Sequence, residues 1–292
     1  MMNRRDLLNL AVAAGTASAV LPTIARAADE SSTATRQIID TNVNLFQWPF
    51  RRLPLDDIDA LVNKLRSLGV TSAWAGSFEG LLQRDVAAVN ARLANACRNR
   101  TELTPIGSVN PTLPGWENDL QQCSTMHNMP GMRLHPNYHG YTLNDPRFAR
   151  LLELAVKAGL FVQIAVSMED TRTQNSIMQV ADVDLSPLPA VLENVPEAKI
   201  QLLNHKLRSP LLQQPGKCDG VFFDTARVDG TDGIPQLIAR LPTGRVLFGS
   251  HAPFLIPEAA LIRVHESDIL DEAGLRSVLS ENAKQAFRKA SA

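Results

Sequence analysis

Short apolar runs alternate with segments of helical periodicity along most of this chain. Between the runs, apolar side chains recur every three or four residues, as over residues 58–68, and Gly69 or Gly159 follows where such a segment ends. Asp145 and Pro146 supply a capping residue and a first-turn proline for a further helix. Eight apolar runs have the length and composition of buried strands, at residues 38–44, 70–76, 103–109, 131–135, 160–166, 199–203, 220–224 and 245–248.

This alternation predicts an α/β fold with a parallel sheet wrapped by helices, one of them capped by Asp184 and ended by Pro196. Eight strand–helix units favour a (β/α)8 TIM barrel over an open doubly wound sheet, and the glycine fingerprint of a dinucleotide-binding first turn is missing. Because barrels of about 250 residues form one domain, residues 37–292 are interpreted as a single domain. The chemistry of such a barrel lies where its strands end.

The first residues differ in composition from the rest. Arg4 and Arg5 precede an uncharged segment that reaches Ala25, where small residues mark an expected cleavage position. Residues 1–27 are therefore predicted to be a twin-arginine signal peptide, and residues 28–36 a short linker. The predicted location is periplasmic or secreted, with the twin-arginine export machinery as a partner. A membrane anchor is the alternative, but polar residues interrupt the run of about 20 apolar ones that a comfortable span needs.

Composition narrows the classes of partner and site. The formal net charge is -1, and no run of basic residues is present, which argues against nucleic acid as a partner. The three cysteines, Cys97, Cys123 and Cys218, form no C-x-x-C pair, so neither a disulfide framework nor a zinc ribbon is indicated.

Polar side chains occur where several predicted strands end. Asn42 and Asn44 are two residues apart on the first strand, so both are expected on one face at the barrel mouth. Arg133 and His135 share a face of the fourth strand, and a cation beside an imidazole suits a carboxylate-bearing ligand. His251 follows the last strand; an imidazole, with an unperturbed pKa of about 6.5, can act as a general base without a metal.

Several segments together carry a resemblance to a known family. Residues 39–44 (IDTNVN) stand where that family has a strand ending in Asp-x-His-x-His, and residues 247–253 (LFGSHAP) are similar to its last-strand Phe-Gly-Ser-Asp-x-Pro. Residues 107–111, 145–162 and 281–283 match further segments in the same order. The chain thus resembles the amidohydrolase-related family (amidohydrolase 2), similar to aminocarboxymuconate-semialdehyde decarboxylase. The resemblance implies a metallo-dependent hydrolase-like barrel.

The same resemblance identifies substituted metal ligands. In family members with metal, two histidines of the first strand, one ending the fifth and an aspartate of the last hold a divalent ion. Here they are matched by Asn42, Asn44, Ala165 and His251. A catalytic zinc site uses about three His, Asp, Glu or Cys ligands, which amides and a methyl group do not supply. The expected metal ligands and cofactors are therefore none.

A metal site rebuilt from other histidines is the alternative. His135, His139, His205 and His251 are enough in number, and barrel tops bring distant strand ends together. No compact ligand pair supports such a site, because a proline separates the first two in an expected loop.

Roles for the polar residues follow from these positions. His251 is assigned as the base and Arg133 as the group that orients a carboxylate, while Asp224 is interpreted as part of a solvated loop. His205 ends the sixth strand, although a one-residue shift would place Asn204 there, and this register stays open. The predicted catalytic residues are His251, His205 and Arg133, and the predicted substrate-binding residues are Asn42, Asn44, His135, His139 and Gln163.

Two classes of function are consistent with the sequence. The first is an exported amidohydrolase-superfamily hydrolase that acts on a small carboxylated ring, lactone or ester without the usual divalent metal. Lactonase or esterase chemistry is favoured over decarboxylation, because an activated ester needs less electrophilic help than a reaction that relies on metal-bound water. The second is a catalytically degenerate barrel that binds a small molecule or a protein. The sequence identifies neither the substrate nor the oligomeric state, so a homo-oligomer stays open.

Overall fold

A computed structural model of the chain describes residues 37–206 and 218–287, so the predicted signal peptide and linker lie outside the described residues. The strands are β1 (Ile38–Leu45), β2 (Val70–Ser77), β3 (Leu103–Pro105), β4 (Gly107–Ser108), β5 (Gly131–Leu134), β6 (Phe161–Ala165), β7 (Ile200–Leu203), β8 (Val221–Asp224) and β9 (Val246–Leu247). The α-helices are α1 (Ile58–Ser67), α2 (Val86–Cys97), α3 (Trp116–Thr125), α4 (Pro136–His139), α5 (Pro146–Lys157), α6 (Leu188–Asn194), α7 (Gly233–Arg240), α8 (Pro257–His265), α9 (Glu272–Arg276) and α10 (Asn282–Ala286).

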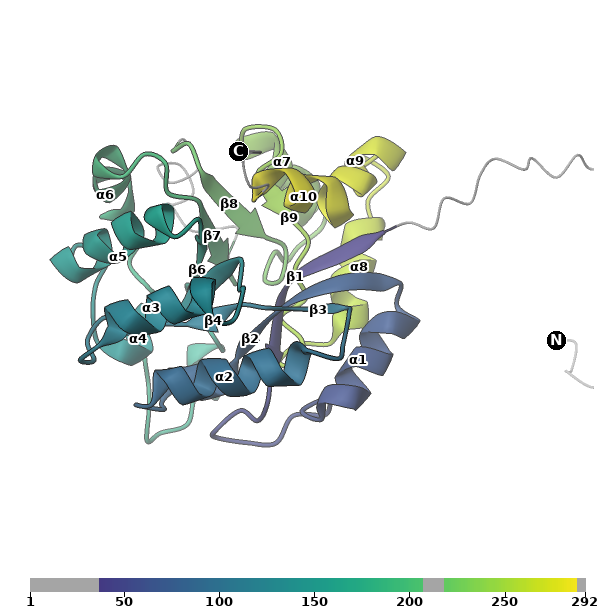
Figure 1. The fold of residues 1–292 in the computed structure, drawn as a ribbon. Helices are drawn as coiled ribbons and strands as arrows, with labels where there is room; N and C mark the ends of the chain where they lie inside the picture. The colour runs from purple at the N-terminus through teal and green to yellow at the C-terminus, as the bar shows by residue number, and fades with distance from the viewer. Residues whose placement is uncertain (1–36, 207–217, 288–292) are drawn as a thin grey trace, which may run out of the picture. The chain divides into compact units, whose positions relative to one another are not determined.

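All paired strands run parallel and close into a barrel, with the helices outside (Figure 1). The ladder runs β1-β2-β3 and then β4 to β9 in sequence order. Thr41 N–H donates to the Phe248 oxygen at 2.9 Å, which joins β1 to the end of β9. The third predicted strand is divided into β3 and β4 because Pro105 has no N–H to continue the ladder. The predicted (β/α)8 barrel is confirmed.

Side-chain capping explains where several of the helices begin. The Asp57 side chain accepts from Ala60 N–H at the start of α1, and the Asp145 side chain accepts from Arg147 N–H at the start of α5. The predicted cap of α6 is wrong, because Asp184 instead accepts from Ser186 N–H in the preceding turn. Within the described ranges, no helix combines the length and apolar character needed to cross a bilayer.

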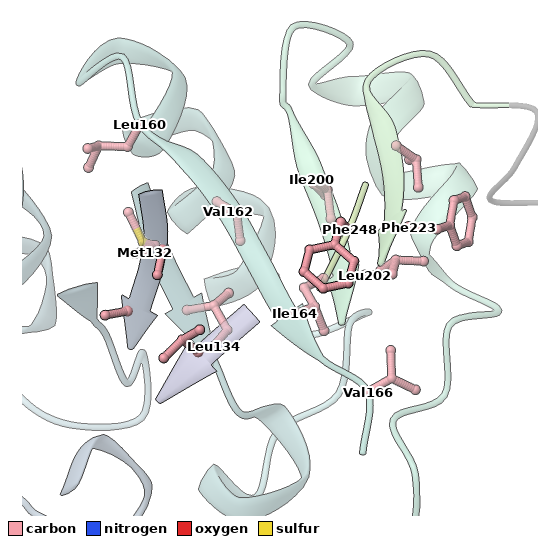
Figure 2. Packing of buried hydrophobic residues seen from close by; sticks show 14 of the residues in the cluster. Met132, Leu134, Leu160, Val162, Ile164, Val166, Ile200, Leu202, Phe223 and Phe248 are labelled. Atoms are coloured by element: carbon pink, nitrogen blue, oxygen red, sulfur yellow. The ribbon is translucent and has the colours of Figure 1, made fainter. Parts of the chain in front are cut away.

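Strand side chains alternate between the helices and the barrel interior. On β5 to β9 the outward positions are apolar, including Met132, Leu134, Val162, Ile164, Ile200, Leu202 and Phe223, and Figure 2 shows these residues packed in one cluster. This packing buries the strands against the helices, so the inward residues are the ones left to form a site.

The barrel interior is divided into three levels. At the bottom, a layer of apolar residues from five strands and from the junction between β3 and β4 packs against α10 and Phe287: Ile39, Trp74, Ile106, Phe161, Phe222 and Leu247. The next inward positions are mostly polar or glycine: Thr41, Gly76, Ser108, Arg133, Gln163, Gln201, Asp224 and Gly249. At the top, a third cluster closes the mouth with Trp48, Leu53, Phe78, Leu81, Ala165 and Met168. The candidate site is therefore a buried polar layer between two apolar ones.

Candidate active site

A chain of hydrogen bonds crosses the polar layer. Gln201 Nε2 donates to Thr41 Oγ1 at 2.7 Å, and Gln163 Nε2 donates to Gln201 Oε1 at 2.8 Å. Arg133 Nε donates to Gln163 Oε1 at 2.9 Å. The strand register places Arg133 beside Gln163 and Gln163 beside Gln201, so the three side chains adjoin on neighbouring strands. The predicted role of Gln163 as a substrate contact does not follow, because its amide is engaged within the barrel.

Arg133 is likewise engaged by the protein. Its NH1 donates to Asn44 Oδ1 at 2.7 Å and to the Val43 oxygen at 3.0 Å, and the side chain is buried. Burial lowers the pKa of Arg133 to about 10, against the attraction of Asp224 and Asp40. The guanidinium is therefore charged at neutral pH. Its donors bond to groups of the barrel itself, and the expectation that Arg133 orients a substrate carboxylate stays a prediction.

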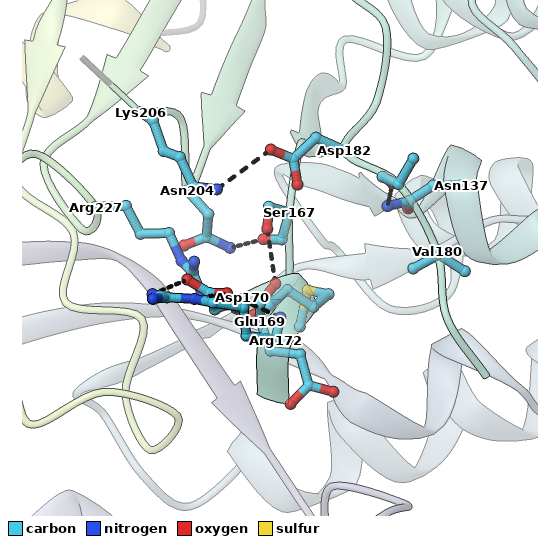
Figure 3. Close-up of polar contacts among 12 residues, drawn as sticks. Asn137, Ser167, Glu169, Asp170, Arg172, Val180, Asp182, Asn204, Lys206 and Arg227 are labelled. Carbon is cyan, nitrogen blue, oxygen red and sulfur yellow. Dashed lines mark hydrogen bonds and ion pairs between the residues drawn. The ribbon is translucent and has the colours of Figure 1, made fainter. Parts of the chain in front are cut away.

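Asn42 lies between two other polar groups. Its Nδ2 donates to Asn204 Oδ1 at 2.8 Å and to Asp224 Oδ2 at 2.6 Å. Asn204 N–H donates to Asp224 Oδ1 at 2.9 Å. Asn204 Nδ2 donates to the Ser167 oxygen at 2.7 Å (Figure 3). Asn204, rather than His205, therefore contacts the polar layer at the end of β7.

His205 is directed elsewhere. Asn204 has a left-handed backbone with φ of 59°, and His205 packs edge-on against Phe223, with ring centroids 5.8 Å apart. Phe223 is one of the outward residues of β8, and His205 Nε2 is buried without a hydrogen-bond partner among the described residues. Burial lowers the pKa of His205 to about 4. The assignment of His205 as a catalytic residue stays a prediction, and the contact that the structure shows for its ring is with Phe223.

Two buried carboxyl groups meet at Asn42. Asp40 Oδ1 accepts from Asn42 N–H at 3.1 Å and from Ser250 N–H at 2.9 Å, while Asp224 binds the Asn42 side chain. Burial raises the pKa of Asp40 to about 6 and the pKa of Asp224 to about 7. The interpretation of Asp224 as part of a solvated loop is wrong, because its side chain is buried.

His251 presents a nitrogen lone pair in the buried interior. Its Nε2 lies 2.8 Å from the Met168 oxygen, which can only accept, so Nε2 carries the proton. Nδ1 is left without a hydrogen-bond partner among the described residues. Burial, aided by the nearby charge of Arg227, lowers the pKa of His251 to about 3. The imidazole is therefore neutral at physiological pH. Its backbone φ of 58° is rare outside glycine, and such strain concentrates at functional sites.

His135 and His139 form a second pair of imidazoles, with ring centroids 5.9 Å apart. His135 is buried, and neither ring nitrogen has a hydrogen-bond partner in the described part of the chain. Burial lowers the pKa of His135 well below its usual range, with smaller contributions from His139, Arg133 and His251. His139 Nε2 is bonded to the Gly80 oxygen at 3.0 Å. His135 is therefore the imidazole of this pair that makes no hydrogen bond in the described chain, and it lies close enough to His251 for the charge of that ring to affect its pKa.

Aromatic side chains seal this polar layer from above. The Trp48 ring contacts those of Phe78, Tyr138 and Phe254, with centroids 5.3, 6.2 and 5.2 Å away. Phe254 also stacks on His251 at 5.1 Å. We call Trp48, Phe50, Phe78, Tyr138 and Phe254 the aromatic plug. A ligand must displace part of the plug to reach His251, because that side chain has no exposed surface.

An ion pair fastens the plug at its edge. Arg51 NH1 lies 2.6 Å from Glu169 Oε2, and the Arg51 guanidinium carbon lies 4.9 Å from the centre of the Phe254 ring. One surface cavity, of about 540 Å³, reaches the aromatic plug, because Phe78 lines it together with Asp56 and Arg100. Another, of about 400 Å³, is lined by Asn137 and Val180.

Comparison with protein families identifies the chain. The family model described as amidohydrolase matches residues 39–289. The chain belongs to the amidohydrolase family. Among solved structures, this amidohydrolase is similar to 5-carboxyvanillate decarboxylase LigW from Sphingomonas paucimobilis, with 14% identity, a TM-score of 0.69 and coverage of 87% of this chain and 100% of that one.

A 2,6-dihydroxybenzoate decarboxylase from Rhizobium gives 11% identity, a TM-score of 0.67 and coverage of 86% of this chain and 98% of that one. At these identities the likeness shows the shared fold. The search of curated proteins finds no match to this amidohydrolase.

The donor set of this amidohydrolase does not fit the divalent metal that the family implies. Asn42 and Asn44 bind Asp224 and Arg133, Ala165 has no donor, and His251 Nε2 is bonded to a backbone oxygen. Among the described residues, no three His, Cys, Asp or Glu side chains are grouped so as to hold a metal ion. We therefore derive no chemical step through a metal.

Sequence reasoning missed three contributors to the site. Asp224 shares the inward face of β8 with Phe222, and the strand-end rule alone would have placed it in the barrel. Trp48 and Phe254 follow the first and last strands closely, which was the available signal for the aromatic plug. Asn204 was recognised only as an alternative to His205.

Proposed function

We propose that the protein hydrolyses a small carboxylated ring ester or lactone without a resident divalent metal, with His251 as the general base. The observation that carries the proposal is the Nδ1 atom of His251, which is deprotonated, held in one tautomer by the Met168 oxygen and free of other partners in the described chain. Water that reaches His251 would reduce the desolvation that lowers its pKa and so strengthen it as a base.

The substrate class is supported by the surroundings of His251. The aromatic plug offers ring faces, and Asn42 Oδ1 and Asn44 Nδ2 remain without hydrogen-bond partners among the described residues. The carboxylate would be oriented by Arg227, whose NH2 donates to the same Met168 oxygen at 3.2 Å and whose Nε has no partner in the described ranges. Arg227 thus replaces Arg133 in this role. Two structural neighbours are named for carboxylated aromatic substrates, which agrees with a planar acidic ring.

A substrate panel tests the proposal. The purified full chain would be offered aryl esters, lactones with and without a carboxylate, and carboxylated aromatic rings, with and without a chelator, alongside elemental analysis. We expect ester or lactone hydrolysis that survives chelation, prefers carboxylated members and falls in His251→Gln and Arg227→Gln. His265→Gln is the matched control, because His265 is exposed on α8. Stoichiometric metal required for turnover would refute metal independence, and release of CO2 would assign a decarboxylase instead.

A second function is a barrel that binds a small molecule without turning it over. The aromatic plug over His251 favours it, because a site closed to solvent suits retention of a ligand. Saturable quenching of tryptophan fluorescence by panel members, with no turnover of any of them and no effect of His251→Gln on rates, would decide for binding.

We also propose that the mature protein begins near Ala28 outside the cytoplasm. The paired Arg4 and Arg5 and the uncharged segment after them support this. N-terminal sequencing of the periplasmic or secreted fraction tests it, with Arg4→Lys and Arg5→Lys combined as the export-deficient control. A cytoplasmic protein that retains Met1 would refute it.

A further inference from the structure

The barrel holds a positive charge of its own at the level of the substituted ligands. Among the described residues, Arg133 is the largest side chain that is fully buried. Its guanidinium binds four oxygens, of Asn44, Val43, Gln163 and Trp74, at 2.7, 3.0, 2.9 and 3.4 Å. One of these residues, Asn44, stands where the family resemblance has a metal-binding histidine. The oxygen of this amide therefore faces a guanidinium.

The chain makes room for this cation. A Cβ atom built on Gly76 would lie 2.8 Å from Arg133 NH1, closer than side chains approach, so the absence of a side chain on β2 is needed for the guanidinium to lie there. Asp40 and Asp224 are the buried carboxyls that attract it. Gly76 leaves space for the guanidinium, oxygen acceptors surround it, and Asp40 and Asp224 attract it. Together these features form a site for a planar cation.

We propose that the Arg133 guanidinium is the resident cation of this barrel, and that it excludes a divalent ion from the mouth by charge as well as by the loss of ligands. A metal bound by the side chain at position 44 would lie within about 5 Å of the guanidinium, given metal–ligand distances of about 2 Å and the 2.7 Å bond to Asn44. Like charges at that separation repel strongly inside a protein. The inference rests on the metal-independent part of the proposed function and deepens it.

Restoring the ligands with and without the cation tests this inference. The full chain carrying Asn42→His, Asn44→His and Ala165→His would be compared with the same variant that also carries Arg133→Met or Arg133→Lys. Zinc binding is measured by competition with a chromophoric chelator, after circular dichroism has shown that each variant is folded. We expect zinc to bind at least 100-fold more tightly with Arg133→Met than with Arg133 or Arg133→Lys. Equal zinc affinity in all three, or no zinc binding in any, would overturn the inference.

A measurement on the unaltered chain covers the case in which Arg133→Met does not fold. The Nε–H signal of Arg133, identified by its loss in Arg133→Lys, should persist in NMR spectra at a pH where exposed arginines have lost theirs by exchange, and added zinc should leave it unchanged. Loss of the signal together with the others would overturn the inference. Neither measurement uses a substrate, so failure of hydrolysis and failure of this inference are distinguishable.

Discussion

Replacing Asp224 with asparagine tests whether the barrel holds a carboxyl that resists ionisation. Burial raises the pKa of Asp224 from 3.8 to about 7. Because the folded-state pKa lies above the unfolded one, the stabilisation belongs to the protonated form: it is complete below about pH 4 and is lost as the pH rises through about 7. A pKa change of this size corresponds to roughly 4 kcal/mol in the free energy of unfolding.

We therefore expect the unaltered chain to lose up to about 4 kcal/mol of stability through this group between about pH 4 and pH 8, and Asp224→Asn to lack that loss. A constant offset is also expected, because an amide cannot accept from both Asn42 and Asn204 as the carboxylate does. Urea unfolding at several pH values measures the difference between the two curves, which should change by at least about 2 kcal/mol. Asp219→Asn is the control, since that side chain is fully exposed. Curves that stay parallel within about 0.5 kcal/mol would refute the reasoning.

Three further outcomes are expected. Gly76→Ala should cost about 2 kcal/mol in urea unfolding, because its Cβ would crowd Arg133 NH1 at 2.8 Å, and an unchanged stability would contradict the packing. His251→Gln should lower metal-free hydrolysis by about 10²-fold. For the unaltered chain, kcat/KM should show no rise near the usual imidazole pKa, because burial lowers the pKa of His251 to about 3. A rise in kcat/KM centred near about pH 6.5 would contradict the burial of His251. Phe254→Ala should raise acrylamide quenching of Trp48, whose ring lies 5.2 Å from that of Phe254, whereas unchanged quenching would show that Phe254 does not shield it.

The fold was predictable because the relevant signals are local. Each predicted strand overlaps an observed one, since apolar runs bounded by glycine, proline and polar residues already contain the information that a buried parallel strand needs. The division at Pro105 was also visible in principle, since proline cannot donate to the ladder. The cap at Asp184 failed because an aspartate serves a turn as readily as a helix start, and the sequence does not distinguish the two.

The sequence indicated which side chains of the candidate site lie inside the barrel, but not which groups they contact. Period-two alternation placed Asn42 and Arg133 on the inner face, the strand-end rule placed His251 there, and all three side chains are buried. It could not show which of these side chains the protein itself engages, because those contacts join strands that are distant in sequence. Asn44 and Arg133, whose side chains meet at 2.7 Å, are separated by 89 positions. The left-handed backbone conformation of Asn204 likewise cannot be detected in a pattern of polar and apolar residues.

The distribution of unpaired atoms gives the strongest physical reason to place ligand binding at the top of the polar layer. In the lower part of the polar layer, Thr41, Gln163 and Gln201 satisfy one another through direct hydrogen bonds, so that part of the interior is stable without a ligand. Above it, Asn42 Oδ1 and His251 Nδ1 are buried without partners in the described chain. An unpaired buried polar atom costs about 1–3 kcal/mol. A ligand or ordered water that supplies hydrogen bonds to these atoms removes that cost and binds more tightly for that reason. The same cost favours opening of the aromatic plug, because solvent would then satisfy these atoms.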